Sequence, residues 1–281
     1  MNKSINEIIK IYNNITKNSI KNCLEYTDYL SSSEFENFLF KIPKMWEQRK
    51  KSCRSATIIP LIRILYNDKI PKELINSLIS LDVKINTFDE LLDKDSLKNF
   101  EKAAFVMSNL FSDLSIIEFA GNNEIIDNYK KYLTDIVTIP YIEKRTYKKI
   151  LETEKSKEGI YEAFKSYKYR SKDISIFIEL PNINLNLNIN QKLKKQIYTY
   201  RMLELLSKDL LDLEDDIENN ETKPTTAYVK KYRDKNIVIK KINLIKKRIS
   251  YNVEWSNTNS KIEEYFSNLR NELGGIQNER I

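Results

Sequence analysis

Acidic residues crowd the stretch 205–225, LLSKDLLDLEDDIENNETKPT, and three of them recur at helical spacing. Asp209, Asp212 and Asp216 lie three and four residues apart, so on a helix their carboxylates line one face. Carboxylates arranged in this way could share hard divalent cations. The alternative is an ordinary charged helix surface that is simply solvated.

A second, weaker acidic cluster lies far upstream in the segment DELLD. On a helix, Asp89 and Asp93 are stacked one turn apart with Glu90 beside them. Two acidic helix faces opposed across a bundle would form an oxygen-lined site for Mg²⁺ ions, whose natural anionic ligand is a diphosphate. The chain has 0 histidines, which excludes Ser-His-Asp and Cys-His catalysis and HExxH zinc chemistry. Any metal ligands are therefore expected to be oxygens.

The elements that must position these residues are predicted to be helices. Only 4 glycines and 6 prolines interrupt 281 residues, and 41% of the chain is hydrophobic, enough for a substantial core. We predict an all-α fold, a single-domain bundle of about ten to twelve helices over residues 1–281, with a possible accessory N-terminal segment 1–42. The run 171–180 alternates like a strand, but an isolated strand among helices would lack a partner, so a helix is preferred there.

Several boundaries are predicted from caps and breakers. A helix is expected to start near Pro60, and another to run from Pro71 to about Leu81, with a new one capped by Thr87 or Asp89. The remaining predicted helices that bear on the site cover 122–137, 140–154, 159–169, a stretch ending before a loop at Pro181, 191–219, 236–249 and 261–273, the last followed by a Gly274-Gly275 tail.

Compartment is indicated by what the sequence lacks. Cys23 and Cys53 form no CxxC pair, so neither a disulfide framework nor a zinc site is suggested and reduced cytoplasmic thiols are expected. The N-terminus does not resemble a signal peptide, and no apolar run is long enough for a transmembrane segment. A soluble cytoplasmic protein is therefore expected.

With both acidic motifs in place, the sequence resembles the class I isoprenoid synthases, the all-α superfamily of prenyl diphosphate synthases, squalene and phytoene synthases and terpene cyclases. These proteins carry an aspartate-rich motif on one helix and a second metal motif on a facing helix. In terpene cyclases the second motif reads (N/D)Dxx(S/T)xxxE, and this chain has Lys208, Asp209, Asp212 and Asp216 in the corresponding positions. The downstream NNETKPTTAYVKKY and the basic Arg170 before the motif extend the resemblance, which covers roughly residues 50 to 270.

The resemblance implies a Mg²⁺-dependent terpene synthase that ionises a linear prenyl diphosphate and then cyclises the carbocation or eliminates a proton. Roughly two or three Mg²⁺ ions, or Mn²⁺, would be bound by the two acidic motifs. The implied metal ligands are Asp89, Glu90, Asp93, Asp209, Asp212 and Asp216, of which Asp89, Asp93, Asp212 and Asp216 would be catalytic. Arg170, Lys208 and Arg233 would bind the diphosphate, and the 17 tyrosines and 11 phenylalanines could line a dry carbocation pocket. A homodimer is compatible with this interpretation.

Lys208 departs from the family pattern, because the family usually has Asn or Asp there and an ammonium repels a metal ion. Lys208 would either contact the diphosphate directly or mark a degenerate, inactive site. For Arg170 the alternative is a surface ion pair with Asp173 or a neighbouring helix. The basic group 49–54 lacks the glycine typical of chain-elongating prenyltransferases, which favours cyclase chemistry, while chain elongation and head-to-head condensation remain alternatives.

A protein of another class, a catalytically inactive helical module that binds a partner or nucleic acid, is the competing interpretation. The 47 Lys and Arg residues exceed the 40 Asp and Glu residues and give a net charge of +7. Basic and acidic residues nevertheless alternate along the chain, and no nucleic-acid-binding motif is present. The charge pattern therefore argues against a nucleic-acid partner.

Overall fold

The computed structural model describes residues 54–66, 70–92, 123–187, 189–251 and 253–278, together with residues 10 and 14. Every regular element in these ranges is a helix, and no strand occurs among them. The predicted all-α fold is confirmed. Within the described residues, no helix combines the length and the apolar character that crossing a membrane requires.

The chain divides into two compact units. One comprises Met1–Ile126 with Ile183–Leu187, and the other comprises Asp127–Asn182 with Asn188–Ile281. The single domain over residues 1–281 with an accessory segment 1–42 stays a prediction, and that segment lies outside the described residues apart from residues 10 and 14.

In the first unit, helices α3 (Arg54–Leu65) and α4 (Lys72–Leu92) pack against each other. Nη1 of Arg54 donates to Oδ1 of Asp82 and Oδ1 of Asn86, both at 3.0 Å. These polar anchors lie beyond the predicted end of the helix near Leu81, and α4 continues through them to Leu92. The helix thus has no break at the predicted caps Thr87 and Asp89. Likewise α3 begins at Arg54 and contains Pro60, instead of starting there.

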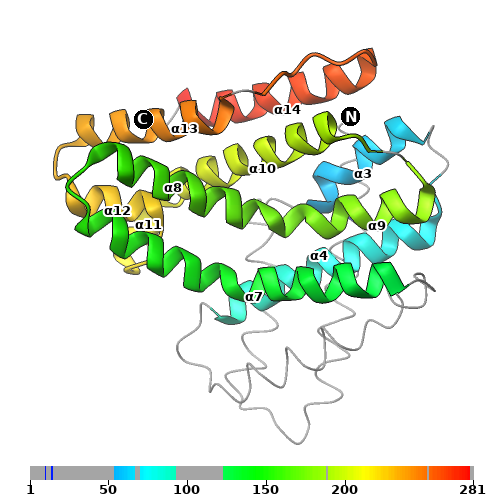
Figure 1. The fold of residues 1–281 in the computed structure, drawn as a ribbon, viewed down its shortest axis with the longest axis horizontal. Coiled ribbons are helices and arrows are strands. Elements are labelled where there is room, and N and C mark those ends of the chain that lie inside the picture. The colour runs from blue at the N-terminus through cyan, green and yellow to red at the C-terminus, as the bar shows by residue number, and fades with distance from the viewer. Residues whose placement is uncertain are drawn as a thin grey trace, which may run out of the picture. The chain divides into compact units, whose positions relative to one another are not determined.

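The second unit contains the remaining described helices, apart from residues 123–126 and 183–185, which belong to the first unit. They are α7 (Asn123–Glu152), α8 (Ser156–Arg170), the 3₁₀ turn η1 (Ser171–Ile174), α9 (Ser175–Leu185), α10 (Gln191–Leu211), α11 (Leu213–Glu218), α12 (Pro224–Lys231), α13 (Lys235–Ser250) and α14 (Ser260–Asn278). Helix α10 contacts α8, η1, α11, α13 and α14, and Figure 1 shows it running alongside α8. The acidic motif therefore lies at the end of the helix that contacts α8, α13 and α14 of this unit.

Local sequence signals explain where several of these helices start. The Asn190 side chain caps α10 by accepting from the Leu193 N–H at 2.9 Å. Asp234 caps α13 in the same way, and Pro224 occupies the first turn of α12. The acidic stretch is thus preceded by α10 and followed by α12, and the start of each of these helices is explained by the local sequence.

Several helix boundaries were predicted wrongly because prolines and glycines lie inside helices that continue through them. Helix α7 continues through Pro140, where two helices were predicted, and α9 continues through Pro181, where a loop was predicted. Pro181 is buried with its neighbours Phe177 and Leu180, so packing outweighs the lost backbone hydrogen bond. The predicted Gly274-Gly275 tail also belongs to a helix, because α14 extends to Asn278. The helix preferred over a strand for 171–180 is confirmed.

Candidate functional site

A buried ion pair joins the last residue of α8 to the acidic motif on α10. Nη1 of Arg170 donates to Oδ2 of Asp209 at 2.5 Å, and Nη2 donates to Oδ1 at 3.0 Å. Arg170 is 8% exposed and Asp209 is 1% exposed. This fork-on-fork geometry is the strongest form of a charged hydrogen bond. Two residues predicted from separate parts of the sequence thus meet directly.

Two further side chains complete the surroundings of this pair. Nε of Arg170 lies 2.8 Å from Oε1 of Glu143 on α7, and the Tyr167 hydroxyl donates to Oδ2 of Asp209 at 2.9 Å. Burial opposes ionisation of Asp209, but the Arg170 charge and hydrogen bonds outweigh it and lower the pKa of Asp209. Burial, reinforced by the Asp209 charge, raises the pKa of the Tyr167 hydroxyl well above its ordinary value. Asp209 is therefore an ionised carboxylate with both oxygens occupied.

A second ion pair lies beside the first. Nζ of Lys223 donates to Oδ1 of Asp216 at 2.6 Å, and the buried Oδ2 of Asp216 has no hydrogen-bond partner. Burial raises the pKa of Asp216 to about 6, with the charges of Asp209 and Asp212 adding to the effect and Lys223 opposing it. Burial would lower the pKa of Lys223, but Asp209 and Asp216 together raise it to about 12. The charges of these residues are therefore coupled.

Asp212 separates α10 from α11, which corrects the predicted unbroken helix over 191–219. Its backbone, with φ −89° and ψ 4°, leaves the helical region for one residue. The hydrogen bonds nevertheless continue across it, from the Asp212 N–H to the Lys208 carbonyl at 3.0 Å and from the Asp216 N–H to the Asp212 carbonyl at 2.8 Å. The three aspartates consequently remain close enough for their charges to interact, as the helical spacing predicted.

The carboxylates of the second acidic motif do not form a metal-binding group. Among the described residues, no group of three or more Asp, Glu, Cys or His side chains is arranged to bind a metal ion. Arg170 and Tyr167 occupy Asp209, and Lys223 occupies one oxygen of Asp216. In this arrangement the second acidic motif binds protein cations and does not fit a metal cluster.

The first acidic motif falls largely outside the described structure. Asp89 and Glu90 lie near the end of α4, but their side chains are outside the described ones, and Asp93 is outside the described residues altogether. The predicted pairing of this motif with Asp212 across a bundle therefore stays a prediction.

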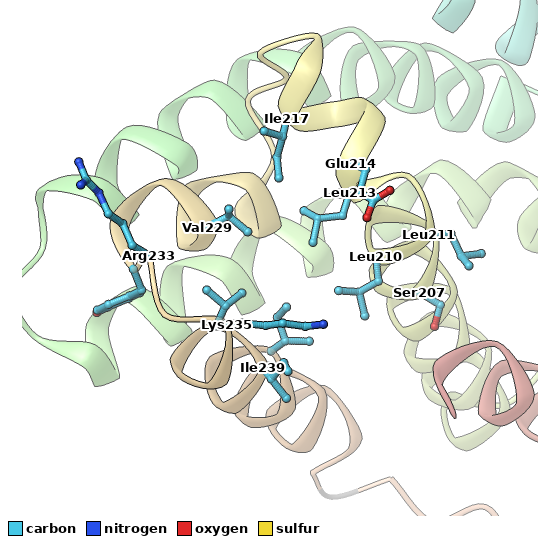
Figure 2. Close-up of a pocket in the computed structure, with 13 residues that line it drawn as sticks. Ser207, Leu210, Leu211, Leu213, Glu214, Ile217, Val229, Arg233, Lys235 and Ile239 are labelled. Carbon is cyan, nitrogen blue, oxygen red and sulfur yellow. The ribbon is translucent and has the colours of Figure 1, made fainter. Parts of the chain in front are cut away.

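Arg233 lies away from the charge cluster. It is exposed, on the loop between α12 and α13, and it lines a pocket of about 340 Å³. Figure 2 shows apolar side chains of this pocket coming from the end of α10, α11, α12 and α13, including Leu210, Leu213 and Val229. No aspartate of the motif is among the lining residues. The pocket occupies a different face of α10 and α11 from the acidic one.

Lys208 is half-buried on α10, one residue before Asp209. Consecutive helical residues point about 100° apart, so Lys208 and Asp209 are directed to different sides. The alternative partner considered for Arg170, Asp173, is instead bound by Arg201, whose Nη2 donates to Oδ2 of Asp173 at 2.5 Å. The ion pair with a neighbouring helix does form, but it is buried and not on the surface.

Sequence reasoning did not identify Glu143, Tyr167 and Lys223 as members of the cluster. Tyr167 lies one helical turn before Arg170, so its place on the same side of α8 could have been found from spacing. Lys223 directly precedes the helix-starting Pro224, which marks the return of the chain toward the acidic motif. Glu143 gave no signal, because it is one of many charged residues along α7.

Comparisons of the chain with protein-family models, with curated proteins and with solved structures find no match. The fold and the site thus define an all-α protein with a buried cluster of coupled charges, and the suggested superfamily depends on the sequence motifs.

Proposed function

We propose that this protein belongs to the class I isoprenoid synthases and promotes ionisation of a linear prenyl diphosphate, in the manner of a terpene cyclase. The supporting observation is the buried cluster in which Arg170 and Lys223 meet Asp209 and Asp216 of the acidic motif. Buried, mutually perturbed charges from separate helices are typical of functional sites.

The two cations of the cluster suit a diphosphate. The planar guanidinium of Arg170 matches two phosphate oxygens at once, and the ammonium of Lys223 acts as a compact point charge. Arg170 is paired with Asp209 and Glu143, and Lys223 with Asp216, so a diphosphate would have to compete with these carboxylates for both cations. Their role would be to stabilise the charge that develops on the departing diphosphate.

Magnesium enters the proposal through the first acidic motif. Asp89, Glu90 and Asp93 would bind Mg²⁺, and the bound ion would neutralise the diphosphate as it leaves. No step is assigned to a metal at Asp209 or Asp216, because protein cations occupy those carboxylates. The cyclase role is preferred to chain elongation or head-to-head condensation on the sequence pattern alone.

The test is incubation of the full chain with Mg²⁺ and geranyl, farnesyl or geranylgeranyl diphosphate. The expected result is release of inorganic diphosphate together with hydrocarbon or alcohol products, detected by gas chromatography and mass spectrometry. Asp89→Ala and Arg170→Gln should abolish release, whereas Asp215→Asn, at an exposed carboxylate beside the motif, should retain it. Absence of release with all three substrates would contradict the proposal.

A catalytically inactive helical binding protein is the second candidate. It is favoured by the occupied state of Asp209, both of whose oxygens already accept hydrogen bonds from Arg170. Calorimetric binding of a prenyl diphosphate without turnover would support this candidate.

A further inference from the structure

The acidic face of α10 and α11 contains an internal cation. Lys223 lies seven residues beyond Asp216 in the chain, and its ammonium approaches Oδ1 of Asp216 at 2.6 Å. The same ammonium interacts electrostatically with Asp209, whose carboxylate lies on the preceding helix. Carboxylates stacked over two helical turns are a common setting for a divalent cation, and here a lysine provides the positive charge.

The loop that carries Lys223 is built to hold it in place. The Glu221 N–H donates to the Asp216 carbonyl at 2.8 Å, and the Lys223 N–H donates to Oγ1 of Thr226 at 3.1 Å. Asn220, with a φ of 55°, adopts the left-handed conformation that reverses the chain after α11. The Lys223 side chain is 21% exposed, far less than a solvated surface lysine. The contact with Asp216 is therefore a product of the local fold.

One oxygen of the motif is left without a partner. Asp216 is 5% exposed, and its Oδ2 accepts no hydrogen bond within the described residues. A buried carboxylate oxygen in this condition costs free energy unless a donor or a cation satisfies it. The motif therefore retains capacity to coordinate a cation, but the neighbouring ammonium repels any metal ion that approaches.

We propose that Lys223 is the resident cation of the second acidic motif, occupying the position in which a divalent ion would otherwise bind to Asp216 with its neighbour Asp212. The wild-type protein then binds no divalent ion at this motif. The presence of Lys208, where the family usually has an Asn or Asp metal ligand, therefore removes no metal binding. This inference concerns the chain's own charges and holds whether or not the protein turns over a substrate.

The experiment is a titration of the full chain with Mn²⁺ alone, with free Mn²⁺ followed by electron paramagnetic resonance. Lys223→Met removes the charge and keeps the length of the side chain, so this variant should bind one more Mn²⁺ than the wild type. Its affinity at that site should be at least about tenfold higher than any wild-type binding there, because a like charge has been removed from contact distance. Lys223→Arg keeps the charge and should behave as the wild type.

Asp216→Asn provides two further comparisons. In the Lys223→Met background it should abolish the additional Mn²⁺ site, whereas in the wild-type background it should leave Mn²⁺ binding unchanged. Either no additional site in a folded Lys223→Met protein, or weaker Mn²⁺ binding in the single variant Asp216→Asn, would overturn the inference. The second comparison remains decisive even if Lys223→Met does not fold. Failure of diphosphate release would contradict the proposed function alone and leave these outcomes unaffected.

Discussion

Arg170 contacts two carboxylates on two different helices, Asp209 on α10 and Glu143 on α7. An arrangement of this kind contributes to folding as well as to any binding role, because each buried charge needs the others. Removing one member leaves an uncompensated charge in a low-dielectric environment. Substitutions at this cluster must therefore be assessed for stability before loss of activity is assigned to chemistry.

Asp209→Ala is expected to lower the free energy of unfolding by about 3 kcal/mol, the usual cost of removing one partner of a buried ion pair. Urea denaturation followed by circular dichroism would measure the loss. Asp212→Ala is the matched control, since its side chain is half-buried and makes no cap hydrogen bond to α11. The control should lose less than about 1 kcal/mol. Equal losses in the two variants would contradict the energetic importance of the Arg170–Asp209 pair.

Glu162 on α8 allows a pH-dependent prediction away from the cluster. Burial opposes its ionisation, but hydrogen bonds from Lys165 and Lys149 outweigh it, so the pKa of Glu162 is lowered from its ordinary value of 4.5. A carboxyl whose pKa is lower in the folded state contributes stability above the unfolded pKa and loses it as pH falls through the folded pKa.

Glu162→Gln should therefore be less stable than the wild type near neutral pH, by about 1 kcal/mol or less because the pair is partly exposed to solvent. The difference should shrink as the pH falls below 4.5 and disappear once the pH is below the lowered pKa of the folded state, where the wild-type carboxyl is also neutral. Thermal melts across this pH range, repeated at high salt, would show the effect. A difference that persists in acid would assign the loss to packing.

At the scale of elements, α8 approaches α12 closely at Gly159. A Cβ at this position would lie 3.2 Å from Oη of Tyr228, whose buried hydroxyl has no hydrogen-bond partner within the described residues. The absence of a side chain thus lets a ring of α12 pack against the first turn of α8. The identity of residue 159 and the hydroxyl of residue 228 should be energetically coupled.

Gly159→Ala alone is expected to be neutral or destabilising, because the gain of about 1 kcal/mol in helix propensity is offset by the close contact. Tyr228→Phe should cost little, since it removes an unsatisfied buried hydroxyl. The double variant should gain most of the stabilisation that alanine gives a helix over glycine, and it should be more stable than either single variant. Urea denaturation of the four proteins would yield the coupling energy, and simple additivity would contradict this account of the contact.

Helices could be predicted from the sequence far better than their ends. Sparse glycine and proline with apolar residues at helical spacing predicted the element type throughout the described part. The misplaced boundaries lie at Pro140, Pro181 and Asp212, where tertiary packing decides whether a break occurs. Packing of this kind is invisible to local propensity.

For the molecule as a whole, the sequence predicted Arg170 and the aspartates of the candidate site, but neither Lys223 nor the pairing of the charges. The spacing of Asp209, Asp212 and Asp216 predicted one acidic face, and the structure brings their charges together. That Arg170 would bind Asp209 while Lys223 binds Asp216 depends on how α8, α10 and the α11–α12 loop meet. Packing between residues so far apart in the chain produces no periodic pattern in a single sequence.

The described helices from α7 to α14 share a core of their own, apart from residues 123–126 and the short segment Ile183–Leu187. Helix α10 is buried by α8, α13 and α14, with Phe266 of α14 fully buried. We therefore predict that a fragment covering residues 123–281 folds independently and contains the Arg170–Asp209 cluster intact.

This fragment should show a helical circular dichroism spectrum and a single cooperative urea transition that Asp209→Ala shifts to lower denaturant. A shorter fragment, 123–258, lacks α14 and exposes the face of α10 against which that helix packs, so it should lose cooperativity or aggregate. If the 123–281 fragment shows no cooperative transition, this unit depends on residues 1–122 for its stability. Identical unfolding of the two fragments would instead show that α14 contributes little to the core around α10.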